Sequence, residues 1–319
     1  MTLALLLGAG FSKWATDLPV ARQLFDFDIE PWGPRENQKI EIVKSLKQSW
    51  DQTNPGGLAE QFIAYALNLS EKSREAVLWY VARRLSEPFI WKEFHAHRWR
   101  RHVLMIDENR GFNVAGVLEA ENFLQRFYHP SLGGIITTNY DMVVEYALGT
   151  RGFNYGVLNE TLTGRGPYPL SQWRNPVTLK GKVPLAKIHG SISWDENARY
   201  TNGRRALTGS ALIVAPTPEK RPPEPLKFVW ELAERLLERA TALVLFGFSL
   251  NPYDEAVLNL LQSAGKDLDS ILLIDIDPKI ERAHHLWPSA MITSCQPPPE
   301  GDAEIRSWQT TGTTVLRAS

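Results

Sequence analysis

Cysteine is almost absent from this chain, whose 319 residues include only Cys295. A single cysteine excludes a disulfide framework within the chain and argues against a structural zinc site built from cysteines. The chain also lacks an excess of either charge, because 35 basic and 36 acidic residues leave a formal net charge of −1 at pH 7. No global positive field is therefore available to recruit nucleic acid.

Long hydrophobic runs, internal repeats and low-complexity tracts are lacking as well. No run reaches the roughly 18 apolar residues that a membrane-spanning helix needs. A composition of 43% hydrophobic and 22% charged residues is ordinary for a globular protein. We therefore expect a soluble, cytoplasmic enzyme without direct membrane contact, folded as one domain over residues 1–319.

What the sequence does contain begins with a short apolar run at residues 3–7 that leads into a glycine-rich turn. Such a run is typical of a parallel strand buried on both faces. Glycines at its end allow backbone amides to approach a pyrophosphate, although a plain tight turn is the alternative. A hydroxyl in this turn can donate to the pyrophosphate or cap a helix. The residues of the turn are Gly8, Ala9, Gly10, Phe11 and Ser12.

Three later apolar segments also end in compact polar residues. In an open parallel sheet the carboxyl ends of the strands border one crevice, so all four ends are predicted to converge on a ligand. Residues 134–136 run into Thr137-Thr138-Asn139-Tyr140-Asp141, residues 183–188 into His189-Gly190-Ser191, and residues 242–246 into Gly247-Phe248-Ser249-Leu250.

The remaining segments alternate between strand and helix patterns, which predicts an α/β fold with a doubly wound, Rossmann-like parallel sheet. We expect strands at residues 211–214 and 271–274, helices at 224–239 and 252–264, a long irregular loop at 151–181 and an edge strand near 313–316.

Residues 31–130 are predicted to form a helical insertion over the mouth of the crevice. Apolar spacing predicts helices at residues 36–50, 58–69, 71–86 and 115–128. Residues 91–101, rich in arginine and tryptophan, are interpreted as a further amphipathic helix, with binding to RNA or an acidic partner as the alternative. Its histidines are not expected to bind metal, because neighbouring arginines oppose a divalent cation.

The ordered set of motifs resembles the sirtuin superfamily, and more closely its bacterial branch of sirtuin-like NAD-consuming proteins. Two departures separate it from the sirtuin deacylases: residues 20–24 replace their Asp-Phe-Arg element, and their four-cysteine zinc ribbon has no counterpart. The resemblance spans residues 3 to about 277 and rests on Gly8-Ala9-Gly10-Phe11-Ser12 with Leu18-Pro19, Thr137-Thr138-Asn139-Tyr140-Asp141, Lys187-Ile188-His189-Gly190-Ser191 and Gly247-Phe248-Ser249-Leu250.

The resemblance implies three catalytic residues. Asn139 would hold a ribose hydroxyl or an attacking water, and Asp141 would accept from the nicotinamide carboxamide. A helix N-cap and a first-turn acid are the respective alternatives. His189 would be the general base, because imidazole titrates near neutrality; a satisfied core histidine is the alternative.

The resemblance also implies NAD as the substrate. No metal is expected, because one cysteine and scattered histidines cannot assemble a tetrahedral zinc site. Ser12 and Thr138 would join the glycine-rich turn in binding the cofactor, and Gly247 and Ser249 would approach its adenosine half. Asp275 follows a buried strand and would accept from the adenosine ribose, unless it only terminates the strand.

The function implied is hydrolysis of NAD to nicotinamide and ADP-ribose, as in sirtuin-like effectors of bacterial anti-phage defence. A catalytically silent sensor or scaffold that binds NAD or ADP-ribose is the alternative, and an NAD-dependent protein deacylase is disfavoured by the two departures. The implied partners are a second copy of the chain in a homo-oligomer, a ring ATPase or a nucleic-acid-guided sensor. The insertion would be a lid or assembly surface, or it would only complete the core.

Overall fold

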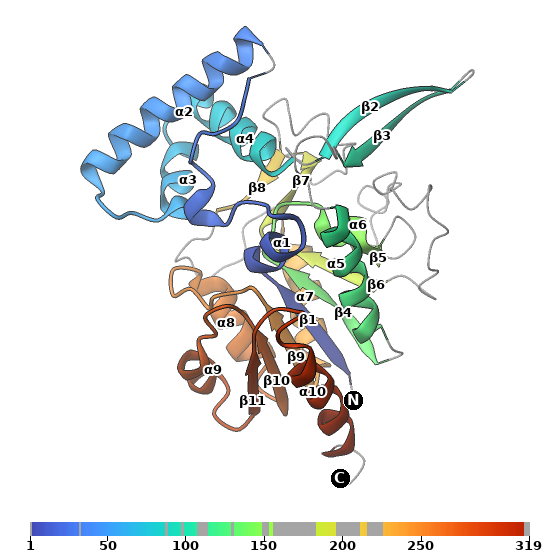
Figure 1. The fold of residues 1–319 in the computed structure, drawn as a ribbon. Coiled ribbons are helices and arrows are strands. Elements are labelled where there is room, and N and C mark those ends of the chain that lie inside the picture. Colours follow the sequence, from blue (N-terminus) through green and yellow to red (C-terminus); the bar gives the residue numbers. More distant parts are fainter. Residues whose placement is uncertain are drawn as a thin grey trace.

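Seven parallel strands form the central sheet, in the order β11-β10-β9-β1-β4-β6-β5 (Figure 1). The computed structural model describes residues 2–31, 33–86, 89–96, 99–106, 114–128, 131–148, 153–155, 183–195, 211–215 and 226–315. The strands of the sheet are β1 (Leu3–Leu7), β4 (Leu132–Thr137), β5 (Phe153–Asn154), β6 (Val183–Lys187), β9 (Ala242–Phe246), β10 (Ser270–Ile274) and β11 (Met291–Cys295).

Helices cover both faces of this sheet, so β1, β9 and β10 are buried along their whole lengths. Continuous apolar runs suit strands that contact helices on both sides. One face carries α1 (Ala9–Thr16), α5 (Val114–Phe127), α6 (Val143–Leu148) and α10 (Asp302–Val315); the other carries α7 (Lys227–Glu238) and α8 (Glu255–Ala264), with α9 (Ile280–Leu286) beside β11. The predicted doubly wound α/β fold is confirmed.

The chain leaves β1 toward β4 and later returns to β9 on the opposite side of β1. The neighbouring strands β1 and β9 therefore form a topological switch point, from which the chain continues to α1 on one face of the sheet and to α8 on the other. Open α/β sheets bind ligands at such a point.

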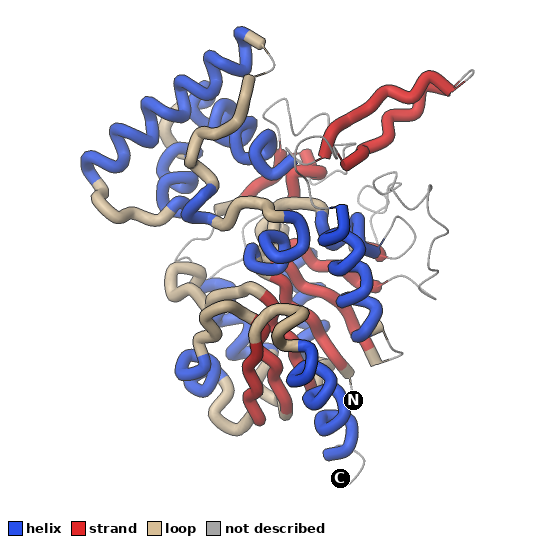
Figure 2. Tube along the Cα trace, in the orientation of Figure 1, coloured by secondary structure: helices blue, strands red, loops and turns tan. Residues whose placement is uncertain are grey.

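The segment between β1 and β4 adds a helical group beyond the carboxyl ends of the strands (Figures 1 and 2). It comprises η1 (Ala21–Gln23), α2 (Pro34–Thr53), α3 (Ala59–Leu67) and α4 (Glu71–Ser86). These helices pack on one another, and α4 also packs on the antiparallel pair β7 (Gly190–Asp195) and β8 (Ala211–Ile213). The helices predicted at residues 36–50, 58–69, 71–86 and 115–128 are confirmed.

Two predictions of secondary structure are wrong. Residues 91–101 contribute to an antiparallel hairpin, β2 (Phe89–Ala96) and β3 (Trp99–Ile106), where aromatic and β-branched residues favour strand over helix. The interpretation of His95, His102 and Glu93 as residues of one helix fails with it, and His97 lies outside the described residues. Residues near 313 belong to α10 and not to an edge strand; Ile305 and Trp308, three positions apart, are buried as helix spacing requires.

Most of the loop predicted at residues 151–181 lies outside the described residues. Among the described helices, none has both the length and the apolarity needed to cross a membrane.

Candidate active site at the carboxyl ends of the strands

Three glycines bring the loops after β1 and β9 into backbone contact. A Cβ on Gly8 would lie 2.4 Å from the Gly247 carbonyl oxygen, and one on Gly10 would lie 2.6 Å from the Gly247 Cα. Gly247 has φ +64°, a left-handed conformation that strains residues with a side chain. The amides of Gly8 and Gly10 donate to the carbonyls of Phe246 and Gly247, over 2.9 and 3.0 Å. Close packing of the two loops therefore requires these glycines, whatever ligand they face.

Asn139 connects the loop after β4 to the loop after β1. Its Nδ2 donates to the Gly8 carbonyl and to the Ser12 hydroxyl, each over 2.8 Å, and the residue is 6% exposed. Because both amide hydrogens are bonded, Oδ1 is the atom that can accept from a ribose hydroxyl or a water. Asn139 is not a helix N-cap, because α6 begins only at Val143. Ser12 is not one either, because Gly8 has the N-cap position of α1.

Asp141 satisfies the amide at the start of α6. Its Oδ1 accepts from the Val143 amide over 2.9 Å, as expected of an acid at the start of a helix. Its carbonyl accepts from the Lys187 ammonium. The predicted contact with a nicotinamide carboxamide would have to use the other carboxylate oxygen.

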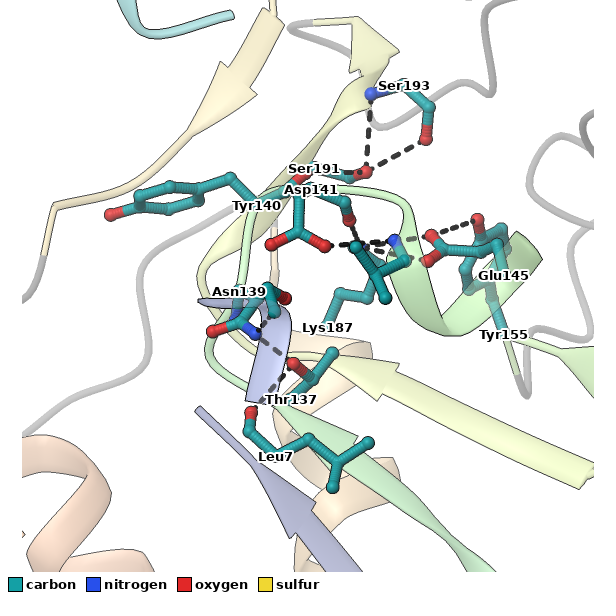
Figure 3. Close-up of polar contacts among 12 residues, drawn as sticks. Leu7, Thr137, Asn139, Tyr140, Asp141, Glu145, Tyr155, Lys187, Ser191 and Ser193 are labelled. Carbon is teal, nitrogen blue, oxygen red and sulfur yellow. Dashed lines mark hydrogen bonds and ion pairs between the residues drawn. The ribbon is translucent and has the colours of Figure 1, made fainter. Parts of the chain in front are cut away.

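A buried ion pair lies beside this loop, between Asp141 and α6 (Figure 3). Lys187 Nζ lies 3.0 Å from Glu145 Oε1, and both residues have no exposed surface. The Tyr155 hydroxyl donates to the same carboxylate over 3.1 Å. Burial raises the pKa of Glu145, and the neighbouring Lys187 opposes that rise. Lys187 thus holds the Asp141 backbone at the end of β4 against α6.

His189 stands at the turn from β6 into β7. The turn depends on Gly190, whose φ is +86° and whose Cβ, if present, would lie 2.1 Å from the Leu212 carbonyl oxygen. The histidine is 5% exposed, and its Nε2 lies 3.3 Å from Asp254 Oδ2. Asp254 comes from the loop between β9 and α8, so two strand ends supply this pair.

Acidic and phenolic groups surround the His189–Asp254 pair. The pKa of Glu60, on α3, is raised, mainly by burial and to a smaller extent by the charge of Asp254. A hydrogen bond with its own backbone and the nearby His189 oppose this rise. Burial, aided by Glu60 and Asp254, raises the pKa of Tyr140 well above its ordinary value, so the phenol stays protonated and donates to the Val214 carbonyl over 2.9 Å. The Tyr140 and His189 rings are 6.2 Å apart.

The structure distributes the other predicted residues unevenly. Phe11 is fully buried, with its ring 5.3 Å from that of Phe246, so its side chain belongs to the core. Ala9 and Ser249 are exposed, and Thr138 is half-buried in the loop after β4. Asp275 accepts from the Asp277 amide over 2.9 Å, which is the behaviour of a strand-terminating acid.

Sequence reasoning missed Lys187, Glu60 and Asp254. Asp254 follows Gly247 and Ser249 within the same strand-end segment, which was the available signal. Glu60 carries no sequence signal, because only the tertiary packing of α3 brings it near His189. No group of three or more metal-ligating side chains has metal-binding geometry within the part of the chain that the structure describes.

Residues 133–288 match the SIR2-like domain. The match covers just under half of the chain. The SIR2-like segment runs from β4 through α9, and it contains Asn139, Asp141, His189, Gly247 and Asp254. The loop after β1 lies outside the match and reaches the SIR2-like segment through the contacts of Gly8, Gly10 and Ser12.

Comparison with curated protein sequences returned no significant match. Similar solved structures include Sir2Tm bound to a propionylated peptide, at 14% identity and a TM-score of 0.39, over 98% of this chain and 93% of that one. Another is a Sir2–p53 peptide–NAD⁺ complex, at 14% identity and a TM-score of 0.38 over the same shares. Identities and TM-scores this low carry no argument about this chain.

Proposed function

We propose that this protein is an NAD hydrolase, which breaks the bond between nicotinamide and ribose to give nicotinamide and ADP-ribose. The observation that supports the proposal is the placement of Asn139 and His189, each two residues beyond the Thr137–Lys187 pair of the neighbouring strands β4 and β6 in a SIR2-like segment. A protein that only binds NAD has no need of a base beside the bond that breaks.

Cleavage of NAD requires the protein to position the ribose and the attacking water and to accept one proton from that water. Nicotinamide leaves NAD as a neutral group, and positive charge develops on the ribose as the C–N bond breaks. Water then adds to the same carbon and loses a proton, which His189 accepts. Asn139 Oδ1 would hold the water or a ribose hydroxyl, so that attack occurs at a fixed geometry.

Deacylation of lysine is disfavoured on two grounds from the sequence. Residues 20–24 differ from the deacylase element, and one cysteine cannot supply a four-cysteine zinc site. A silent sensor of NAD or ADP-ribose remains the outcome that a negative activity result would favour.

We further propose that the enzyme acts as a gated effector of bacterial anti-phage defence. A constitutive NAD hydrolase would deplete its own host, so the activity requires restraint. The helices α2–α4 lie beyond the strand ends, and Glu60 of α3 interacts electrostatically with His189 and Asp254. Movement of α3, caused by homo-oligomer formation, a ring ATPase or a nucleic-acid-guided sensor, would alter access to the site.

The test follows nicotinamide release by chromatography while the concentration of purified protein is varied. We expect release whose specific activity rises with concentration, or on addition of the partner. NAD binding without release under all these conditions would favour the sensor. A specific activity that is independent of concentration and partner would contradict the gating proposal alone.

A further inference from the structure

We propose that Asp254 is a positioning residue that fixes the orientation and the tautomer of His189. The inference rests on the proposed NAD cleavage for its kinetic consequence, and on the geometry of the pair for everything else. Asp254 Oδ2 lies 3.3 Å from His189 Nε2, and both side chains are 6% exposed.

Asp254 does not perform the task usual for its place in the chain. It occupies the N-cap position of α8, where aspartate normally accepts a backbone amide of the first helical turn. No such side-chain bond is formed, and the carboxylate instead faces the imidazole. A carboxylate with so little exposure requires a polar or charged partner, and among the described residues His189 lies within ion-pair distance of it.

The contact determines which imidazole nitrogen can act as the base. A carboxylate only accepts hydrogen bonds, so neutral His189 carries its hydrogen on Nε2 and its lone pair on Nδ1. Nδ1 then takes the proton from water, and the Asp254 carboxylate stabilises the imidazolium that forms. The proton moves from water oxygen to Nδ1, and the hydroxyl oxygen bonds to the ribose carbon that nicotinamide leaves.

Other titratable groups near the pair are less suited to this task. Glu60 approaches from α3, and burial raises the pKa of its carboxyl, so it holds its proton more readily than an exposed glutamate does. Tyr140 stays protonated and donates to the Val214 carbonyl. Burial likewise raises the pKa of the Tyr253 phenol, so Tyr253 is not an anion at neutral pH.

The test combines imidazole NMR with kinetics. In protein labelled with ¹⁵N-histidine, long-range ¹H–¹⁵N spectra at a pH where histidines are neutral report which His189 nitrogen carries hydrogen, with His189→Gln used to assign the signal. We expect Nε2–H in the wild type and in Asp254→Glu, and a gain of the Nδ1–H form in Asp254→Asn, whose amide can donate to Nε2. Asp269→Asn, an exposed change at the amino end of β10, is the matched control.

The kinetic readout should separate kcat from KM. Asp254→Asn is expected to lower kcat by about 10²- to 10⁴-fold, with KM and Tm close to wild type, because a misoriented base affects proton transfer and not ground-state binding. An unchanged His189 tautomer in Asp254→Asn would overturn the proposal, and so would an unchanged kcat. If the wild type released no nicotinamide at all, the function would fail while the NMR result still decided the role of Asp254.

Discussion

Asn139 and Ser12 lie 127 positions apart in the chain, yet the Asn139 amide donates to the Ser12 hydroxyl over 2.8 Å. This bond joins the loop after β4 to α1, across two neighbouring strands. It orients the Asn139 side chain, and Oδ1 with it, at the carboxyl ends of the strands. The proposed active site therefore depends on contacts between loops that are distant in sequence.

Removal of the hydroxyl tests this orientation. We expect Ser12→Ala to lower kcat/KM for NAD by up to about 10-fold, the effect of losing one net hydrogen bond of ~1 kcal/mol. Ser263→Ala, which removes a serine hydroxyl from α8, should leave the rate unchanged. Equal rates for Ser12→Ala and the wild type would mean that Gly8 alone orients Asn139.

The packing of the glycine loops predicts a contrast between two glycine substitutions. Gly247→Ala should destabilise the fold by at least about 2 kcal/mol, because a Cβ there would lie 2.3 Å from the Phe11 amide nitrogen and φ is left-handed. Gly33→Ala meets no atom within 4 Å and should be tolerated. Urea unfolding of the two variants measures the difference; similar midpoints would contradict the packing argument.

The buried ion pair predicts non-additive mutations. Lys187→Met leaves the Glu145 carboxylate buried without its cation and should cost about 3–5 kcal/mol of unfolding free energy. The double variant Lys187→Met, Glu145→Leu should lose less than the two single losses added together. Chemical denaturation of all four proteins completes the cycle. Strictly additive losses would mean that the two groups do not stabilise one another.

The raised pKa of Glu60 predicts a pH-dependent stability. The folded protein holds this proton more tightly than the unfolded chain does, so the contribution favours folding at acidic pH and is lost as pH rises through the folded-state pKa. Glu60→Gln cannot ionise, and its Tm should exceed that of the wild type at neutral pH, by a margin that shrinks toward about pH 4.

A matched control for this comparison is Glu71→Gln, which removes an exposed carboxylate from the first turn of α4, whereas Glu60→Gln removes a half-buried carboxylate from the first turn of α3. We expect no comparable pH-dependent margin for Glu71→Gln. The same Tm difference for Glu60→Gln at every pH would refute the assignment of a raised pKa.

The parallel sheet could be predicted from sequence because several of its strands are short apolar runs followed by glycine or polar residues. Leu7, for example, is followed by Gly8, and Phe246 by Gly247. The hairpin of β2 and β3 could not, because arginines and aromatics at mixed spacing also fit a helix. The three β-branched residues after Gly312 indicated a strand, but they form the end of α10. This helix is held to the core by the buried side chains of Ile305 and Trp308.

The site was predictable only in part. Asn139 and His189 follow strands directly, so the topology of the sheet alone brings them together. Asp254, Glu60 and Lys187 act through tertiary contacts that span 42 residues or more. Such contacts cannot be predicted from the local sequence. Asp254, for example, precedes a helix and would first be interpreted as its N-cap.

The most direct test of the central claim is nicotinamide release by wild-type protein and by His189→Ala, measured side by side at the same protein and NAD concentrations, with any activating partner present. We predict release by the wild type and a rate at least about 10²-fold lower for His189→Ala, with the Tm preserved. Release at the same rate by both proteins would contradict the role of His189, and absence of release from the wild type would contradict NAD hydrolysis itself.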